Sequence, residues 1–391
     1  MRRNIEVLQR AMWVAFGLVG LALVYWQVLR AGALATRSDN PRRVIAEQRV
    51  RRGKILTADG VALAETLSTP DGLARRHYPY PNLATVTGYY SLRYGTGGLE
   101  AAFDERLRGE ARQTWLDRAM HRPPVGQNIT VTVRLAAQVA ADAALAEAGV
   151  SGAALVLDAR SGAVRVMASR PTFDPNTLDA KWDALSGDPD APLLNRATQG
   201  LFPLGELAYL VGWMGLLERD LSPPADPLHT PLPVLLAPLG GEGVAAVARQ
   251  LGFVDEIPFS LPTTAGFLPS QLPGKAEEIA VTPLHLARVG AALAAAGLAP
   301  TPTLLLAPAE PSPPATPLLK PETARRIATR QTEFIALAPP DVTGNVPVSW
   351  YLGWTDGDSP QVVVVVVAGA GVDRETAAGI GRRLNPLAMD D

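Results

Sequence analysis

The chain has 391 residues, enough for two domains of ordinary size. Its 36 Lys and Arg residues nearly balance its 38 Asp and Glu residues, which gives no indication of a nucleic-acid partner. Cysteine is absent, which excludes disulfides and thiolate chemistry, and the four histidines are too scattered in the sequence to predict a metal site. We therefore expect no metal and no other cofactor.

The first feature along the chain is an apolar segment at residues 11–29, interrupted by Gln27 and carrying aromatic residues near both ends. About 20 apolar residues suffice to cross a bilayer. A cleaved signal peptide is the alternative, but its apolar core normally has about 7 to 15 residues. The segment therefore predicts one transmembrane helix after a tail of residues 1–10.

Turn and periodicity signals place the next elements. Residues 40–65 contain an Arg-Gly step and an Asp-Gly turn, which predict a β-hairpin. After Gly126 an alternating run predicts a strand, and the sequence LAAQVAADAALAEAG then has helical spacing.

The second half of the chain predicts two hairpins and a capped helix. Residues 152–176 read as two strands about a Ser-Gly turn. Thr282 can cap a helix within residues 276–298, with a proline in its first turn. The proline-rich residues 299–320 predict a surface loop, and residues 346–371 predict a last hairpin with a buried valine strand.

Residues 192–210, PLLNRATQGLFPLGELAYL, resemble the active-site entry of class B penicillin-binding proteins, the cell-wall D,D-transpeptidases. In that family Leu-Asn-Arg-Ala precedes Tyr-Pro-Pro-Gly-Ser-x-x-Lys. The likeness runs, with gaps, over most of residues 40–385 and is strongest to the short actinobacterial-type form. In residues 76–109 it implies a helix that opens at Gly-Leu-Glu and closes at Gly109. It implies an α+β fold, with a pedestal module at residues 30–125. A transpeptidase or β-lactamase-like domain, an antiparallel sheet flanked by helices, would then occupy residues 126–391.

The first catalytic box is predicted to be degenerate. In the family a serine attacks the stem peptide and a lysine one helical turn later accepts its proton. Glu206 stands at the serine position and Tyr209 at the lysine position. The helix dipole accounts for a carboxylate at a helix N-terminus, and a tyrosine does not replace a general base without strong tuning.

The other two boxes are degenerate as well. None of the four lysines follows a serine by three residues or precedes Thr-Gly: Lys54, Lys181, Lys275 and Lys320. The expected place of the family's Lys-Thr-Gly strand is taken by Val342, Thr343, Gly344 and Asn345. No Ser-x-Asn stands before residues 248–253, and a literal Ser-Asp-Asn at residues 38–40 is interpreted as linker.

The resemblance implies a single-pass cell-membrane protein with its large domain outside the cytoplasm. Without an intact box, we predict a pseudoenzyme of peptidoglycan synthesis. It would act as a scaffold or regulator of a SEDS-type membrane glycosyltransferase or another cell-wall synthesis protein. One alternative is an active D,D-transpeptidase that uses Glu206 or a displaced Ser222. The other is a non-catalytic module that binds peptidoglycan stem peptides through Thr343 and Gly344.

Overall fold

The computed structural model describes residues 2–26, 50–70, 73–110, 113–114, 116–117, 120, 124–306, 313–340, 346–355 and 357–389. Contacts within the chain define two units: Met1–Arg51 with Leu67–Arg75, and Arg52–Thr66 with Arg76–Asp391. The predicted boundary between a pedestal at residues 30–125 and a domain at residues 126–391 stays a prediction.

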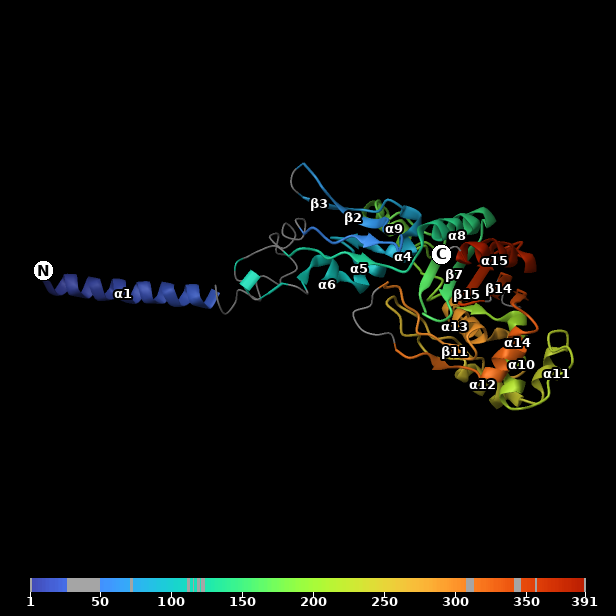
Figure 1. The fold of residues 1–391 in the computed structure, drawn as a ribbon. Coiled ribbons are helices and arrows are strands. Elements are labelled where there is room, and N and C mark those ends of the chain that lie inside the picture. The colour runs from blue at the N-terminus through green and yellow to red at the C-terminus, as the bar shows by residue number, and fades with distance from the viewer. Residues whose placement is uncertain are drawn as a thin grey trace. The chain divides into compact units, whose positions relative to one another are not determined.

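The first unit contains helix α1 (Arg2–Val24), drawn at the blue end of the chain in Figure 1. The helix begins earlier than the predicted transmembrane segment at residues 11–29, and the last three residues of that segment lie outside the described residues. Residues Val7–Val24 are long and apolar enough to cross a membrane, and none of this span is buried in the structure. The helix therefore fits a membrane anchor.

A four-stranded sheet in the order β3-β2-β1-β6 comes next in the chain, and most of its residues belong to the second unit. Strand β1 pairs antiparallel with β2, which confirms the predicted hairpin. The helix predicted at Gly-Leu-Glu is two short helices, α5 and α6, closed by Gly109 with a left-handed φ of 83°. The elements of this part are β1 (Ile55–Leu56), β2 (Ala62–Ser68), β3 (Ala74–His77), η2 (Pro81–Leu83), α4 (Ala84–Thr87), β4 (Tyr89–Ser91), β5 (Gly95–Gly97), α5 (Gly98–Ala102), α6 (Asp104–Arg108) and β6 (Ile129–Thr130).

A buried ion network joins these elements around Glu100, whose side chain is 0% exposed. Arg52 Nε donates to its Oε2 at 3.0 Å, and Arg76 Nε donates to its Oε1 at 2.6 Å. Arg52 also pairs with Asp104 at 2.6 Å. Burial lowers the pKa of Arg52, but attraction to the two carboxylates outweighs it and leaves the pKa raised. The network therefore keeps Arg52 charged inside the fold.

The core of the second unit is a five-stranded antiparallel sheet in the order β13-β14-β15-β7-β8. Its strands are β7 (Ser151–Asp158), β8 (Val164–Arg170), β13 (Glu333–Ala338), β14 (Val348–Trp354) and β15 (Gln361–Ala368). The hairpins β7–β8 and β14–β15 confirm those predicted at residues 152–176 and 346–371. With the flanking helices they give the α+β fold that the resemblance implied.

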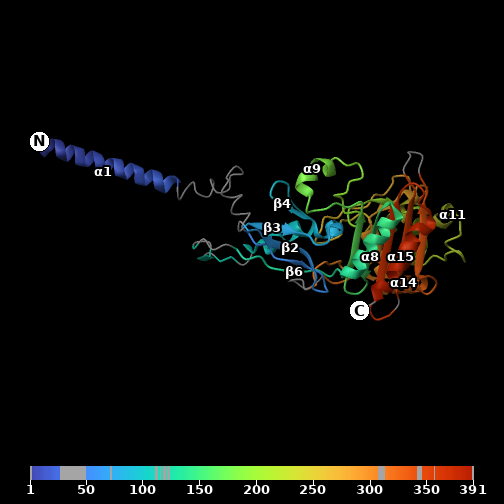
Figure 2. The same ribbon diagram turned by 90° about the horizontal axis from the view of Figure 1, so that it is seen from above.

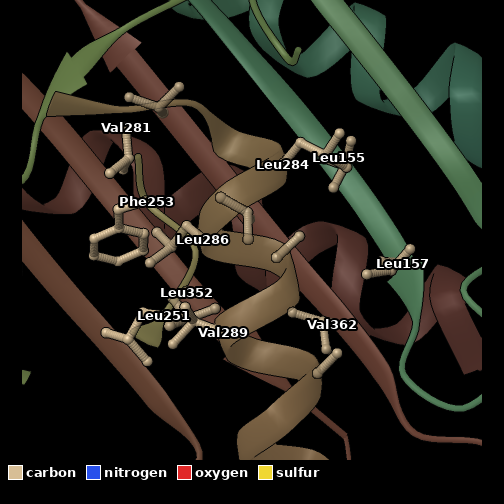
Figure 3. Packing of buried hydrophobic residues seen from close by; sticks show 14 of the residues in the cluster. Leu155, Leu157, Leu251, Phe253, Val281, Leu284, Leu286, Val289, Leu352 and Val362 are labelled. Carbon is tan, nitrogen blue, oxygen red and sulfur yellow. The ribbon is translucent and has the colours of Figure 1, made fainter. Parts of the chain in front are cut away.

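Helices cover both faces of this sheet, which explains the run of six valines in β15. Val362, Val364 and Val366 belong to the core on the side of α13 (Pro283–Ala294), where Figure 3 shows Leu284 and Val289 against the sheet. The intervening valines belong to the core formed with α8 (Leu135–Ala148) and α15 (Arg374–Met389), which lie side by side in Figure 2. A strand buried on both faces has no polar alternation.

Helix α13 begins as its sequence predicted. Thr282 Oγ1 accepts the N–H of His285, which completes a capping box. Gly290 lets the helix approach β15, since a Cβ there would lie 2.5 Å from Val362 Cγ1. The proline-rich segment differs from the predicted loop, because β11 (Leu298–Ala299) pairs with β12 (Thr316–Pro317) across it.

The remaining elements surround the candidate site or lie beside it in the chain. They are α9 (Leu178–Ser186), β9 (Phe202–Pro203), η4 (Gly205–Leu207), α10 (Ala208–Glu218), α11 (Leu232–Leu236), α12 (Gly240–Gln250), η5 (Ala276–Glu278), β10 (Ala280–Val281) and α14 (Pro321–Ala328).

Candidate functional site

The segment predicted to be a degenerate first box lies on a short strand followed by a helix. Strand β9 pairs antiparallel with β10, and the N–H of Leu204 donates to Ile279 O at 2.8 Å. The chain then turns through η4 into α10, so Glu206 lies just before the helix and Tyr209 lies in its first turn. Trp350 on β14 supports this turn, because its Nε1 donates to Pro203 O at 2.8 Å.

Gly205 brings the turn into contact with the edge strand β13. Its φ is +53°, in the left-handed region that favours glycine. A Cβ at this position would lie 2.5 Å from Ala338 Cα and 2.6 Å from Leu337 O. The end of β13 therefore packs directly against the residue that precedes Glu206.

The Glu206 carboxylate is bound by two donors from distant parts of the chain. Its Oε2 accepts the backbone N–H of Leu337 at 2.9 Å, and its Oε1 accepts from Nη2 of Arg374 in an ion pair. The side chain is one-third exposed (33%). The sequence suggested that the helix dipole stabilises this glutamate, and the structure adds two further stabilising groups, a backbone N–H at the sheet edge and a guanidinium. Sequence reasoning missed both partners.

Glu206 and Tyr209 line one hollow of about 530 Å³. Tyr209 is half-buried and packs against the main core. The other lining residues come from η4 and α10, from the loop after α10, from the segment before β13, from β13 itself and from the start of α15: Leu207, Leu210, Leu228, His229, Gln331, Glu333, Phe334, Ile335, Ala336, Arg374 and Glu375. The structure therefore brings together Glu206 and Tyr209, the two positions predicted for the first box.

Residues predicted for the third box, Val342 to Asn345, lie outside the described residues and stay a prediction. They belong to the connection between β13, which ends at Ala338, and β14, which begins at Val348. The strand that contacts Glu206 is β13, and its sequence EFIALA contains no lysine, threonine or glycine. The cation and hydroxyl of a Lys-Thr-Gly strand are therefore missing from this strand.

The second box has no counterpart in the described helices near the site. The segment TPLPVLLAPLGG forms α11 and the start of α12, and it contains neither serine nor asparagine. Residues 38–40 lie outside the described residues. Ser222, the displaced serine of the alternative hypothesis, is exposed after α10 and is not part of the lining of the hollow.

The lysines lie away from the hollow. Lys54 pairs with Glu65, Lys275 with Glu278 and Lys320 with Asp220, while Lys181 lies on α9. Within the part of the chain that the structure describes, no group of three or more His, Asp or Glu side chains could hold a metal ion.

Comparisons with known proteins agree with this fold. The family model of the penicillin binding protein A dimerisation domain matches residues 52–129. The chain is 27% identical to peptidoglycan D,D-transpeptidase PbpA of Mycolicibacterium smegmatis, over 90% of this chain and 91% of that protein. It is also 30% identical to peptidoglycan D,D-transpeptidase MrdA of Escherichia coli, over 34% of this chain and 26% of that protein.

Solved structures show the same fold. The crystal structure of PBPA from Mycobacterium tuberculosis superposes with a TM-score of 0.77 at 22% identity, covering 87% of this chain and 100% of that one. The imipenem acyl-enzyme complex of that protein superposes equally well, with a TM-score of 0.77 at 23% identity over 88% of this chain and 99% of that chain. Sequence likeness over nearly the full length and a shared fold lead to one conclusion. These findings support a class B penicillin-binding protein, and thus a penicillin-binding-protein-like component of peptidoglycan synthesis.

Proposed function

We propose that this chain is a pseudoenzyme of peptidoglycan synthesis, without acyl-transfer activity, that controls a partner protein. The observation that carries the proposal is the state of Glu206. Its carboxylate stands at the family's serine position and is held by Leu337 N–H and Arg374. The hydrogen bond and the ion pair lower the nucleophilicity of this carboxylate and hold it against β13 and Arg374, which disfavours its attack on a substrate carbonyl.

The surroundings of Glu206 add to this argument. Tyr209 replaces the lysine that would accept a proton, and the strand beside it offers no side-chain cation or hydroxyl. Acyl transfer depends on donors that stabilise the developing oxyanion, and here the outer N–H of Leu337 is already engaged by Glu206. We therefore expect neither stem-peptide transfer nor acylation by β-lactams.

Covalent labelling tests the loss of catalysis. Purified full-length protein is incubated with a fluorescent penicillin, beside PbpA of Mycolicibacterium smegmatis as the positive control. We expect no covalent band from this chain under conditions that label the control. A band would contradict the proposal, and the variants Glu206→Ala and Ser222→Ala would then show which residue is acylated. Retention of muropeptides by an unlabelled chain would instead favour the stem-binding alternative.

The proposed partner is a SEDS-type membrane glycosyltransferase, which the family resemblance implies. Two parts of the chain support a partner role: the dimerisation-domain match at residues 52–129 and the outward-facing apolar surface of α1. Trp13 and Phe16 of that helix are 71% and 66% exposed. A membrane helix can pair with another helix through such side chains.

Co-purification from membranes tests this partner. One variant replaces Val7–Val24 with a leucine helix of equal length, which keeps an anchor but removes its sequence. We expect that variant to lose the glycosyltransferase, whereas Glu206→Ala retains it. Equal recovery of the glycosyltransferase with the wild type and the leucine-helix variant would refute recognition through α1.

A further inference from the structure

Leu337 N–H and Arg374 converge on one point at the end of the hollow beside β13. Both are donors, and a carboxylate is the group whose two oxygens match a pair of such donors. In this chain the carboxylate is supplied by Glu206, which reaches the pair from the turn before α10. The arrangement resembles a ligand-binding site in which a side chain of the same chain, Glu206, takes the place of the ligand.

The other carboxylates of the hollow do not compete for Arg374. Glu333 pairs with Arg382 at 2.9 Å, and Glu375 pairs with the same guanidinium at 3.2 Å. The neighbouring Asp373 accepts from Thr376 Oγ1 at 2.6 Å. Removal of the Glu206 carboxylate would therefore leave the Leu337 N–H and the Arg374 guanidinium without that shared acceptor, beside a space of about 530 Å³.

We propose that Leu337 N–H and Arg374 form a binding site for small monocarboxylates, which the chain keeps closed with its own Glu206. This inference rests on the proposed function, because a glutamate that serves as an internal ligand is not available as a nucleophile. A carboxylate that enters the site must displace Glu206. Displacement releases the start of α10 from β13 and α15, so occupancy of the site is coupled to the contact between these elements.

The test uses the full-length protein in detergent with Glu206→Ala and sodium acetate as the probe, against sodium chloride at equal ionic strength. The readouts are the midpoint of thermal unfolding, followed by tryptophan fluorescence, and the NMR line width of ¹³C-acetate. Two variants serve as controls. Glu333→Ala removes a carboxylate of similar exposure from the same hollow, 37% against 33%, and Glu206→Ala with Arg374→Gln removes the guanidinium.

We expect acetate to stabilise Glu206→Ala in a saturable manner and to broaden the ¹³C signal in that variant. For a dissociation constant of about 10 mM, 100 mM acetate would raise the folding equilibrium constant about 11-fold. The wild type, Glu333→Ala and the double variant should respond no more to acetate than to chloride. An equal response of Glu206→Ala and the double variant, or no response in either, would overturn the proposal.

If Glu206→Ala does not fold, Glu206→Gln replaces it. The glutamine amide offers one acceptor oxygen to the two donors, so acetate should still raise the midpoint of thermal unfolding, by a smaller amount than in Glu206→Ala. No change of the midpoint with acetate would overturn the proposal. Penicillin labelling remains a separate measurement. If acetate has no effect and penicillin does not label the wild type, the carboxylate site is refuted and the pseudoenzyme proposal stands. If penicillin labels the wild type, the proposed function is refuted.

Discussion

Substitution of Glu100 by glutamine tests whether the buried ion network stabilises the N-terminal part of the second unit. The carboxylate is completely buried and accepts from Arg52 and Arg76 at 3.0 and 2.6 Å. Glutamine keeps the shape but removes the charge. Arg52 retains Asp104, whereas Arg76 loses its carboxylate partner Glu100 and already has an unsatisfied buried Nη2.

Breaking a buried ion pair on one side costs about 3–5 kcal/mol, because the other charge stays buried without compensation. We expect Glu100→Gln to lower the free energy of unfolding by that amount. Asp104→Asn is the matched control, since it removes the second carboxylate from Arg52 at a side chain that is 33% exposed. Solvent screens this pair, so the control should cost about 1 kcal/mol or less.

Denaturant unfolding of the full-length protein in detergent, followed by tryptophan fluorescence, measures both variants. The reasoning predicts a large decrease in the midpoint for Glu100→Gln and a small one for Asp104→Asn. Equal midpoints for the two variants would refute it. That result would mean that Arg76 reaches water, or that the surrounding backbone carbonyls compensate its charge.

Two further predictions concern the turn before α10 and the cap of α13. Gly205→Ala should destabilise the protein by about 3 kcal/mol, because alanine is strained at this left-handed φ and its Cβ would also clash with Ala338. Gly149→Ala has a similar φ of +66° and no atom within 4 Å, so thermal unfolding should show a much smaller effect, and equal losses would exclude the clash. Burial lowers the pKa of His285 below its ordinary 6.5, so its contribution to stability is full above that pH and declines as the pH falls below it. Unfolding measured from about pH 7 to pH 5 should show a shallower decline for His285→Gln than for the wild type, and parallel curves would contradict this assignment.

The sequence alone determined which catalytic motifs of the family are absent. A side chain absent from the chain cannot be created by folding, so the absence of Ser-x-x-Lys and Lys-Thr-Gly follows from four lysines and their neighbours. The family resemblance implied the α+β fold, whereas local signals predicted the anchor, the hairpins and the Thr282 cap. Each of these depends on residues close together in the sequence.

Tertiary structure alone decided what Glu206 does. Its partners Leu337 and Arg374 lie 131 and 168 residues away, and no periodicity or motif links such positions. The order of strands placed β13 beside the turn, and the left-handed Gly205 allowed the close contact. The same holds for Glu100, whose buried partners are brought together by sheet pairing and helix packing rather than by spacing along the chain.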